Sequence, residues 1–242
     1  MTIYSLPPLI GSIFAILAGL IVLIRNKNYS ISLPFFFFCI TIFVWLFTYS
    51  IAYSTKDIGL TTFCCNLACT AVIFTAPTAY HFIVNYLKLK KFRKMVLFFY
   101  LIMVIFLFFF LFTKYFLDKP VKHFWGYYSK AGPLHPIYLV VHFTILSLAF
   151  FLLYKAVKRK DLSPIEILKI KYIFLVYTIA AFGGIDFLQK YGFEFYPFGF
   201  TFVLLFVGVT SYAILKHRLM DIRLVLTRAT VFIFIYSLVF AI

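Results

Sequence analysis

Long apolar runs separated by short polar segments dominate this sequence. A helix that spans a membrane needs about 20 mostly apolar residues. Seven runs meet or approach this length, at residues 6–24, 33–53, 60–86, 95–113, 136–154, 172–188 and 196–215. An eighth apolar run, 231–242, has 12 residues. The pattern predicts an all-α fold, a polytopic membrane bundle of seven transmembrane helices, with the start of an eighth apolar segment.

The basic residues between these runs predict the orientation of the bundle. Lys and Arg are retained in cytoplasmic loops. The segments that follow the first, third, fifth and seventh runs hold 17 Lys and Arg residues, whereas the segments on the opposite side hold 6. With seven helices, this distribution places the N-terminus outside and the basic stretch 216–228 inside.

The composition excludes an ordinary water-soluble domain. Hydrophobic residues make up 64% of the chain and charged residues 12%, whereas soluble proteins carry about 25% charged residues. The net charge is +16, but the basic residues form short clusters between apolar runs rather than one solvated face. We therefore expect the lipid bilayer, and no nucleic acid, as the partner of this charge.

Neither catalytic motifs nor metal-ligand spacings occur in the sequence. The chain has no HExxH, G-x-S-x-G, P-loop or glycine-rich nucleotide loop, so we expect neither enzymatic activity nor a cofactor. Cys39, Cys64, Cys65 and Cys69 lie in apolar runs without a His or acidic residue at ligand spacing. They are expected to be packing thiols rather than a metal site or a disulfide.

Small residues and one proline indicate how the helices pack. Gly11, Ala15 and Gly19 form a stripe at four-residue spacing in the first run, and Ala180 and Gly184 repeat that spacing in the sixth. Such stripes let helix backbones approach closely in lipid. The third run is rich in hydroxyls and contains a proline at position 77. It is expected to be a central helix, kinked near that proline, where hydroxyls or neighbouring helices satisfy the freed backbone groups.

Ionisable residues at membrane depth are functional candidates by default. The candidates for an outward-facing ligand pocket, with His135 beside them, are Trp125, His142, Asp186 and Glu194.

Some ionisable and aromatic residues of these runs and loops also have a structural explanation. Asp186 can lie at the interface and pair with Lys190 one turn on. Trp125 belongs to the outer segment that also holds Tyr127 and Tyr128, and such aromatics are typical of an interfacial belt. His81, in the third run, is expected to be a hydrogen-bonded packing residue rather than a ligand.

The exit of the seventh run carries a narrow apolar seam. Leucine and isoleucine recur at spacings of 4, 3 and 4 from position 215 to 226, with charged residues between them. This period is typical of a helix that packs on a partner helix, although an interfacial helix on anionic headgroups has the same features. The candidates for signal relay are Leu215, Arg218, Leu219, Asp221, Ile222, Arg223 and Leu226.

Several short motifs occur in a characteristic order along the whole chain. They are Pro34, Trp45, Pro77, Tyr-His-Phe at 80–82, Trp-Gly-Tyr-Tyr at 125–128, Gly-Pro-Leu at 132–134, Tyr-Pro-Phe-Gly at 196–199, Tyr-Ala-Ile at 212–214 and His-Arg-Leu-Met-Asp-Ile-Arg at 217–223. In these motifs the sequence resembles the seven-transmembrane N-terminal sensor region of bacterial histidine kinases. The resemblance implies a sensory input module followed by further membrane helices and an output domain, such as a histidine kinase or a diguanylate cyclase.

These expectations define one domain and one function. Residues 1–223 are expected to form the sensor domain with a juxtamembrane exit helix, and 224–242 the start of a further membrane segment in a truncated chain. The function is expected to be that of a non-enzymatic input module in a two-component system. This module would be a homodimer in the bacterial plasma membrane that relays an unknown stimulus or small-molecule ligand through the seventh helix.

Two other function classes remain open. The alternative is a small carrier or permease for an anionic or apolar solute, with a path lined by Asn66, His142 and Asp186. A membrane enzyme would need a cluster of His and acidic residues at the inner face.

Overall fold

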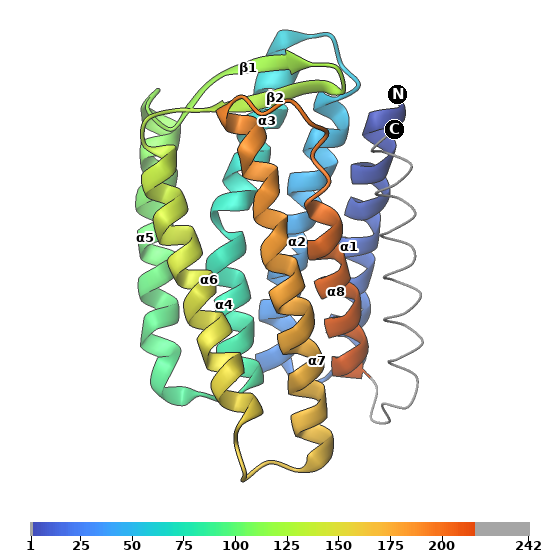
Figure 1. Ribbon diagram of the computed structural model, residues 1–242, viewed down its shortest axis with the longest axis vertical. Helices are drawn as coiled ribbons and strands as arrows, with labels where there is room; N and C mark the ends of the chain where they lie inside the picture. Colours follow the sequence, from blue (N-terminus) through green and yellow to red (C-terminus); the bar gives the residue numbers. More distant parts are fainter. Residues whose placement is uncertain (1, 216–242) are drawn as a thin grey trace.

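The computed structural model describes residues 2–215 of the chain. It is a bundle of helices capped at one end by a β-hairpin (Figure 1). The helices are α1 (Leu6–Arg25), α2 (Tyr29–Ala52), α3 (Ile58–Ile73), α4 (Thr75–Tyr86), α5 (Arg93–Phe112), α6 (His135–Val157), α7 (Pro164–Ala180) and α8 (Phe200–Leu215), with 3-10 helices η1 (Ile3–Ser5), η2 (Lys90–Phe92) and η3 (Ala181–Tyr191), and the strands are β1 (Leu117–His123) and β2 (Gly126–Ala131).

All seven predicted apolar runs form helices. Five helical segments are long and apolar enough to cross a membrane, namely Ile3–Arg25, Tyr29–Ala52, Ile58–Tyr86, Lys90–Phe112 and His135–Val157. The sixth run forms α7, of 17 residues, and continues into η3, while the seventh forms α8, of 16 residues. The chain is thus a multi-pass membrane helix bundle, and the count of seven crossings stays a prediction.

The loops divide by charge between the two ends of the bundle. Figure 1 places the N-terminus and the hairpin at one end, and the α1–α2, α4–α5 and α6–α7 connections at the other. In the described part of the chain, thirteen Lys and Arg residues lie at this second end, against six at the hairpin end. The structure thus gathers the basic loops that the sequence assigned to one side, and we call this the basic end.

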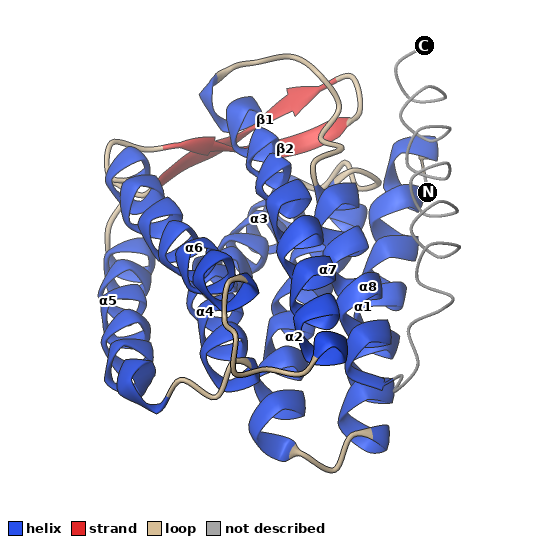
Figure 2. Ribbon diagram, turned by 60° about the horizontal axis from the view of Figure 1, so that its bottom comes forward, coloured by secondary structure: helices blue, strands red, loops and turns tan. Residues whose placement is uncertain are grey.

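The prediction of an all-α fold is wrong for the segment between α5 and α6. Here β1 and β2 pair antiparallel from Leu117 opposite Ala131 to His123 opposite Gly126, and Figure 2 shows this hairpin lying across the end of the bundle. The ladder is irregular between Asp118 and Val121, beside a proline that has no N–H to donate. The strands are short and charged, so no alternation of apolar and polar residues indicated them.

The hairpin also overturns the interfacial-belt interpretation for two aromatics. The side chains of Trp125 and Tyr128 are only 1% and 2% exposed. Gly126, between them, has φ of 135°, and a Cβ there would lie 2.5 Å from Cα of Tyr53. The hairpin therefore packs tightly on the end of α2, and this buries the two rings.

The kink expected near Pro77 is confirmed. The third run breaks at Phe74, between α3 and α4. Hydroxyls meet the carbonyls around the break: Thr78 donates to the Phe74 oxygen at 2.7 Å, and Thr75 donates to the Val72 oxygen at 2.8 Å. Eight of the twelve residues of α4 are buried, which confirms a central position for this helix.

The predicted packing roles of glycine and cysteine hold in the structure. A Cβ at Gly11 would lie 2.7 Å from Leu204 of α8, and one at Gly19 would lie 2.7 Å from Cβ of Cys39 in α2. Close approach of α1 to both helices thus depends on the stripe. All four cysteines are buried with free thiols. His81 shares a 3.4 Å hydrogen bond with the Tyr100 hydroxyl, as expected of a packing residue.

Candidate functional site

A cavity of about 290 Å³ lies inside the bundle, below the hairpin. Its walls come from α2, α3, α4, α6, α7, η3 and α8, and β2 contributes Tyr128. Most lining side chains are apolar or aromatic. The polar and ionisable ones include Tyr49, Thr75, Tyr128, His135, Tyr138, His142, Tyr177, Asp186 and Lys190. A mostly apolar cavity with a few convergent polar groups is the usual form of a small-molecule site.

The polar groups at the hairpin end surround the ammonium group of Lys190. Its Nζ donates to the Tyr49 hydroxyl at 3.3 Å and also to Ser129 Oγ. The same atom lies 5.1 Å from the centroid of the Tyr128 ring, within range of a cation–π interaction. The lysine residue is 5% exposed, so its charged group is held inside the bundle by hydroxyls and aromatic faces.

The hairpin closes this end of the cavity through Tyr128 and Ser129. The Tyr128 ring stacks on Tyr49, with centroids 4.5 Å apart and an interplanar angle of 14°. Tyr49 and Ser129 share a hydrogen bond of 2.8 Å between their hydroxyls. Burial raises the pKa of Tyr128 well above its ordinary value, so its hydroxyl keeps its proton and donates to the backbone oxygen of Asp186 at 2.8 Å. These contacts tie β2 to α2 and to η3.

Asp186 joins η3 to the start of α8. Its carboxylate accepts hydrogen bonds from the backbone N–H of Gly199 at 2.6 Å and of Phe200 at 2.8 Å. A carboxylate is favoured at a helix N-terminus, where N–H groups lack partners within the helix. A Cβ at position 199 would lie 2.8 Å from Oδ1 of Asp186, so glycine is needed for this close approach. The expected pairing of Asp186 with Lys190 is wrong, because each side chain turns to other partners.

Two histidines of α6 form a second polar group on the cavity wall. His142 Nδ1 and the Tyr138 hydroxyl share a hydrogen bond of 2.9 Å, and that hydroxyl also donates to the Val72 oxygen at the break between α3 and α4 at 3.1 Å. His135 Nδ1 lies 2.7 Å from the Tyr191 hydroxyl, at the end of η3. Tyr138 therefore links α6 to the kinked helix, and His135 links α6 to η3.

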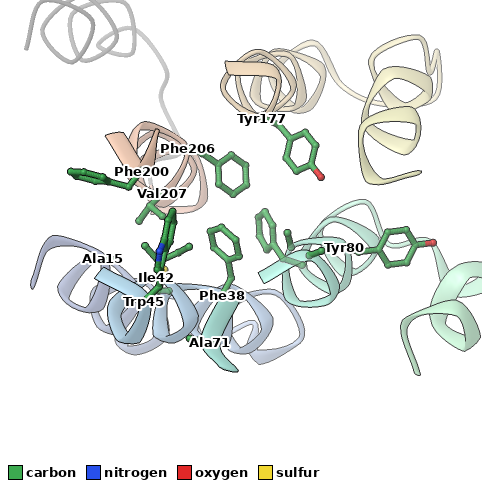
Figure 3. Close-up of a cluster of buried hydrophobic side chains, with 14 of the residues drawn as sticks. Ala15, Phe38, Ile42, Trp45, Ala71, Tyr80, Tyr177, Phe200, Phe206 and Val207 are labelled. Carbon is green, nitrogen blue, oxygen red and sulfur yellow. The ribbon is translucent and has the colours of Figure 1, made fainter. Parts of the chain in front are cut away.

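Farther from the hairpin the walls are aromatic. Figure 3 shows Phe38 of α2, Phe206 of α8 and Tyr177 of α7 pointing into the space between these helices. The Phe206 ring centroid lies 5.6 Å from that of Phe38 and 5.6 Å from that of Tyr177. Tyr177 satisfies its hydroxyl by donating to the Leu146 oxygen at 3.0 Å. Here the cavity offers aromatic surface with its polar atoms already paired.

The structure brings together only some of the predicted site residues. His142 and Asp186 line the cavity, as does their neighbour His135, whereas Trp125 and Glu194 do not. The Trp125 ring stacks on His123 at 4.4 Å inside the hairpin. Glu194 is exposed in the segment that follows η3, because the chain leaves the bundle there.

The other predicted residues lie away from the cavity or outside the described part of the chain. Asn66, proposed for a carrier path, is exposed on α3 and does not line the cavity. Leu215 is the last residue of α8. The other relay candidates, Arg218, Leu219, Asp221, Ile222, Arg223 and Leu226, lie outside the described residues.

Sequence reasoning missed the central residues of the polar end. Tyr49 carried no signal, because aromatics are common throughout this chain. Tyr128 was noted only as an interfacial aromatic and as part of the Trp-Gly-Tyr-Tyr motif. Lys190 carried one, since it is a basic residue next to an apolar run on the side where basic residues are scarce. A lysine in such a place is expected to have a specific partner, and the acidic residue one turn away, Asp186, was the only partner that its sequence neighbours suggested.

The comparisons with known proteins give one match. The family described as the N-terminal 7TM region of histidine kinase matches residues 8–223. No curated protein and no solved structure matches the chain. The matched residues include every helix of the cavity wall, and they cover most of the sequence. The chain therefore belongs to the family of N-terminal seven-transmembrane sensory regions of histidine kinases.

Proposed function

We propose that the chain is the sensory input module of a two-component signalling protein in the bacterial plasma membrane, with its N-terminus outside. Occupation of the cavity changes the packing of α8, and the stretch after Leu215 passes this change to a cytoplasmic output domain. Family membership and the gathering of basic residues at one end support this proposal. The chain itself has no catalytic role in it.

The position of α8 is the observation that carries the proposal. Val203 and Phe206 of this helix line the cavity, and the first N–H groups of the helix are held by Asp186 from η3. The far end of α8, at Leu215, lies at the basic end (Figure 1). One helix thus contacts the cavity, is fixed at one end to a second cavity wall, and ends at Leu215 on the proposed cytoplasmic side.

The energy required is within the range of apolar burial. Moving an output from mostly off to mostly on takes a preference of about 5.5 kcal/mol for one packing. At about 25 cal/mol per Å² of apolar surface, this corresponds to about 220 Å² buried in one packing and not in the other. A ligand of moderate size between aromatic walls supplies an area of this order.

Two copies of the chain are proposed to act together. The seam from Leu215 to Leu226 in the sequence has the spacing of a helix that pairs with another helix. A homodimer would let a change in α8 alter the distance or rotation between two output domains.

A matched pair of variants tests the relay. Residues 1–228 are joined to the cytoplasmic region of a histidine kinase, and autophosphorylation is measured in membrane vesicles. Phe206→Leu, in the cavity wall, is expected to change the rate several-fold, whereas Phe108→Leu, a 56% exposed residue of α5, is expected to leave it unchanged. Inserting Gly-Gly after Arg218 is expected to abolish the difference, because a flexible link does not transmit a helix movement. Equal rates in both variants would contradict the relay.

The carrier alternative has a separate test. The described residues support it less, because Asn66 faces away from the cavity that holds His142 and Asp186. Uptake of an anionic or apolar solute into liposomes containing the chain, and its loss in Asp186→Asn, would favour a carrier over a sensor.

A further inference from the structure

Lys190 is a buried cation without an anion beside it. An ammonium group has three N–H donors, and two of them reach Tyr49 and Ser129. In residues 2–215 both ion pairs, Asp118 with Lys130 and Arg159 with Asp161, lie elsewhere. The acidic side chain on the same 3-10 helix, Asp186, is occupied by backbone N–H groups. A buried charge is costly without a partner, and burial accordingly lowers the pKa of Lys190. An anion entering the cavity would stabilise the protonated form of this group.

The cavity extends away from Lys190 as a long apolar space. Four lining residues of α2, Tyr49, Trp45, Ile42 and Phe38, recur at spacings of 4, 3 and 4 and so share one face of the helix. At 1.5 Å per residue, this face is about 16 Å long. An extended polypeptide advances about 3.6 Å per residue, which is about 1.2 Å for each of its three backbone bonds, and an extended acyl chain advances by a similar length per bond. The space therefore suits an extended chain of about 13 bonds with its anionic end at Lys190.

The cavity reaches the lipid-facing surface between α6 and η3. Phe143, Ser147 and Phe150 of α6 and Ala181 of η3 line the cavity and are also exposed on the outside of the bundle. The facing residues Ala180 and Ala181 are small, whereas at Gly184 the Phe143 ring of α6 packs so closely that a Cβ would lie 2.9 Å from it. In a bilayer these exposed residues face acyl chains, so a ligand that dissolves in the membrane has a lateral way in.

From these three observations we propose that the cavity binds a single-chain fatty acid. The carboxylate takes the free donor of Lys190 and lies beside the hydroxyl of Tyr49, and the chain of about 14 carbons runs along α2 towards Phe38 and Phe206. Specificity for an acid over an alcohol comes from Lys190, and specificity for length comes from the aromatic walls. The role of this ligand as the stimulus rests on the proposed function, whereas its binding does not.

Binding is tested on the full chain in nanodiscs of zwitterionic phospholipid. The probe is radiolabelled myristate, in competition with tetradecanol and with tetradecyl phosphate. Myristate is expected to bind at least tenfold more tightly than the alcohol. Lys190→Met is expected to lose at least tenfold in affinity for myristate and to bind the alcohol as before, whereas Lys122→Met, on the exposed side of the hairpin, is expected to bind both as the wild type does.

A second variant tests the proposal without changing Lys190, so a folding defect of Lys190→Met does not decide the result. Ala181→Trp adds a large side chain at an exposed position of the lateral opening, so it leaves the core intact and is expected to slow myristate uptake at least tenfold. Lys190→Met removes a buried charge but also the hydrogen bonds to Tyr49 and Ser129. The melting temperatures of both variants are therefore measured alongside, and binding is compared at a temperature at which both variants are folded.

The outcomes separate ligand from function. Equal affinity for acid and alcohol, unchanged binding in Lys190→Met, or no binding of either probe would overturn the proposed ligand. Tighter binding of tetradecyl phosphate than of myristate would also overturn it in favour of a phosphate-bearing lipid. Myristate binding that depends on Lys190 supports the ligand, and if autophosphorylation of the kinase fusion then stays unchanged with myristate, the ligand stands and its role as the stimulus fails.

Discussion

At the hairpin end of the bundle Lys190 and Asp186 are buried, whereas at the basic end Arg159, Asp161 and Glu166 lie at the surface. These two buried residues form no ion pair with each other. Lys190 binds hydroxyls and an aromatic face, and Asp186 binds backbone N–H groups. The surface charges form a local ion pair and a helix cap within a few residues of one another. Charge at the basic end therefore acts on orientation and local structure, while the few charges at the hairpin end hold distant parts of the fold together.

The largest difference in stability between the two ends is expected when the carboxylate of Asp186 is removed. Asp186→Ala leaves the buried N–H groups of Gly199 and Phe200 without their acceptor. Hydrogen bonds to charged groups contribute about 1.5–3 kcal/mol each, so we expect the free energy of unfolding to fall by about 3 kcal/mol or more. Asp161→Ala, at the exposed surface of the basic end, is the control and should melt with the wild type in a thermal unfolding experiment in detergent. Similar losses in the two variants would refute the contrast.

The hairpin turn gives a second, smaller effect. Gly126 and Gly192 both have positive φ, at 135° and 98°, but a Cβ at Gly126 would meet the backbone of Tyr53, whereas one at Gly192 would have no atom within 4 Å. A backbone strained in this way costs about 1–3 kcal/mol. Gly192→Ala is expected to lose about 1 kcal/mol of unfolding free energy, and Gly126→Ala about 2 kcal/mol or more. The difference between the two midpoints in denaturant measures how tightly the hairpin is pressed on α2.

The smallest effect is expected at the basic end. Ser163 caps α7 in a capping box with Glu166, and removal of such an N-cap costs about 1 kcal/mol. Ser163→Ala is therefore expected to lower the free energy of unfolding by about this amount without changing myristate binding at the other end. A loss of binding in this variant would show that the two ends are coupled through α7.

The same cap has a pH dependence with a definite sign. The N–H and hydroxyl of Ser163 lower the pKa of Glu166 below its ordinary value of 4.5. A lowered carboxyl pKa stabilises the fold above pH 4.5, and this stabilisation is lost as the pH falls through the lowered pKa. The stability difference between the wild type and Glu166→Gln should therefore be constant near neutral pH and shrink on acidification below 4.5. A difference that grows on acidification would contradict the cap.

The site could be predicted only in part, and the residues show why. Asp186 and His142 were found because ionisable groups inside apolar runs are costly and thus conspicuous. Trp125 and Glu194 were placed with them by their outer position alone, and the turn of the hairpin and the exit from η3 took them elsewhere. The partners of Lys190, namely Tyr49, Ser129 and Tyr128, lie more than 60 residues away in sequence. No local pattern records such a contact.

The sequence by itself determined the helices and how they are distributed between the two ends of the bundle. These outcomes depend on local properties, namely the length of the apolar runs, the spacing of glycines, Pro77 and the clusters of basic residues. Each of these properties acts within its own segment of the chain when that segment enters the bilayer. Only the tertiary structure decided that residues 117–131 fold into a hairpin over the bundle and that Lys190 and Asp186 turn away from each other. These choices depend on which backbone groups and hydroxyls come within hydrogen-bonding distance once the helices are packed. They therefore arise from contacts between segments far apart in the chain.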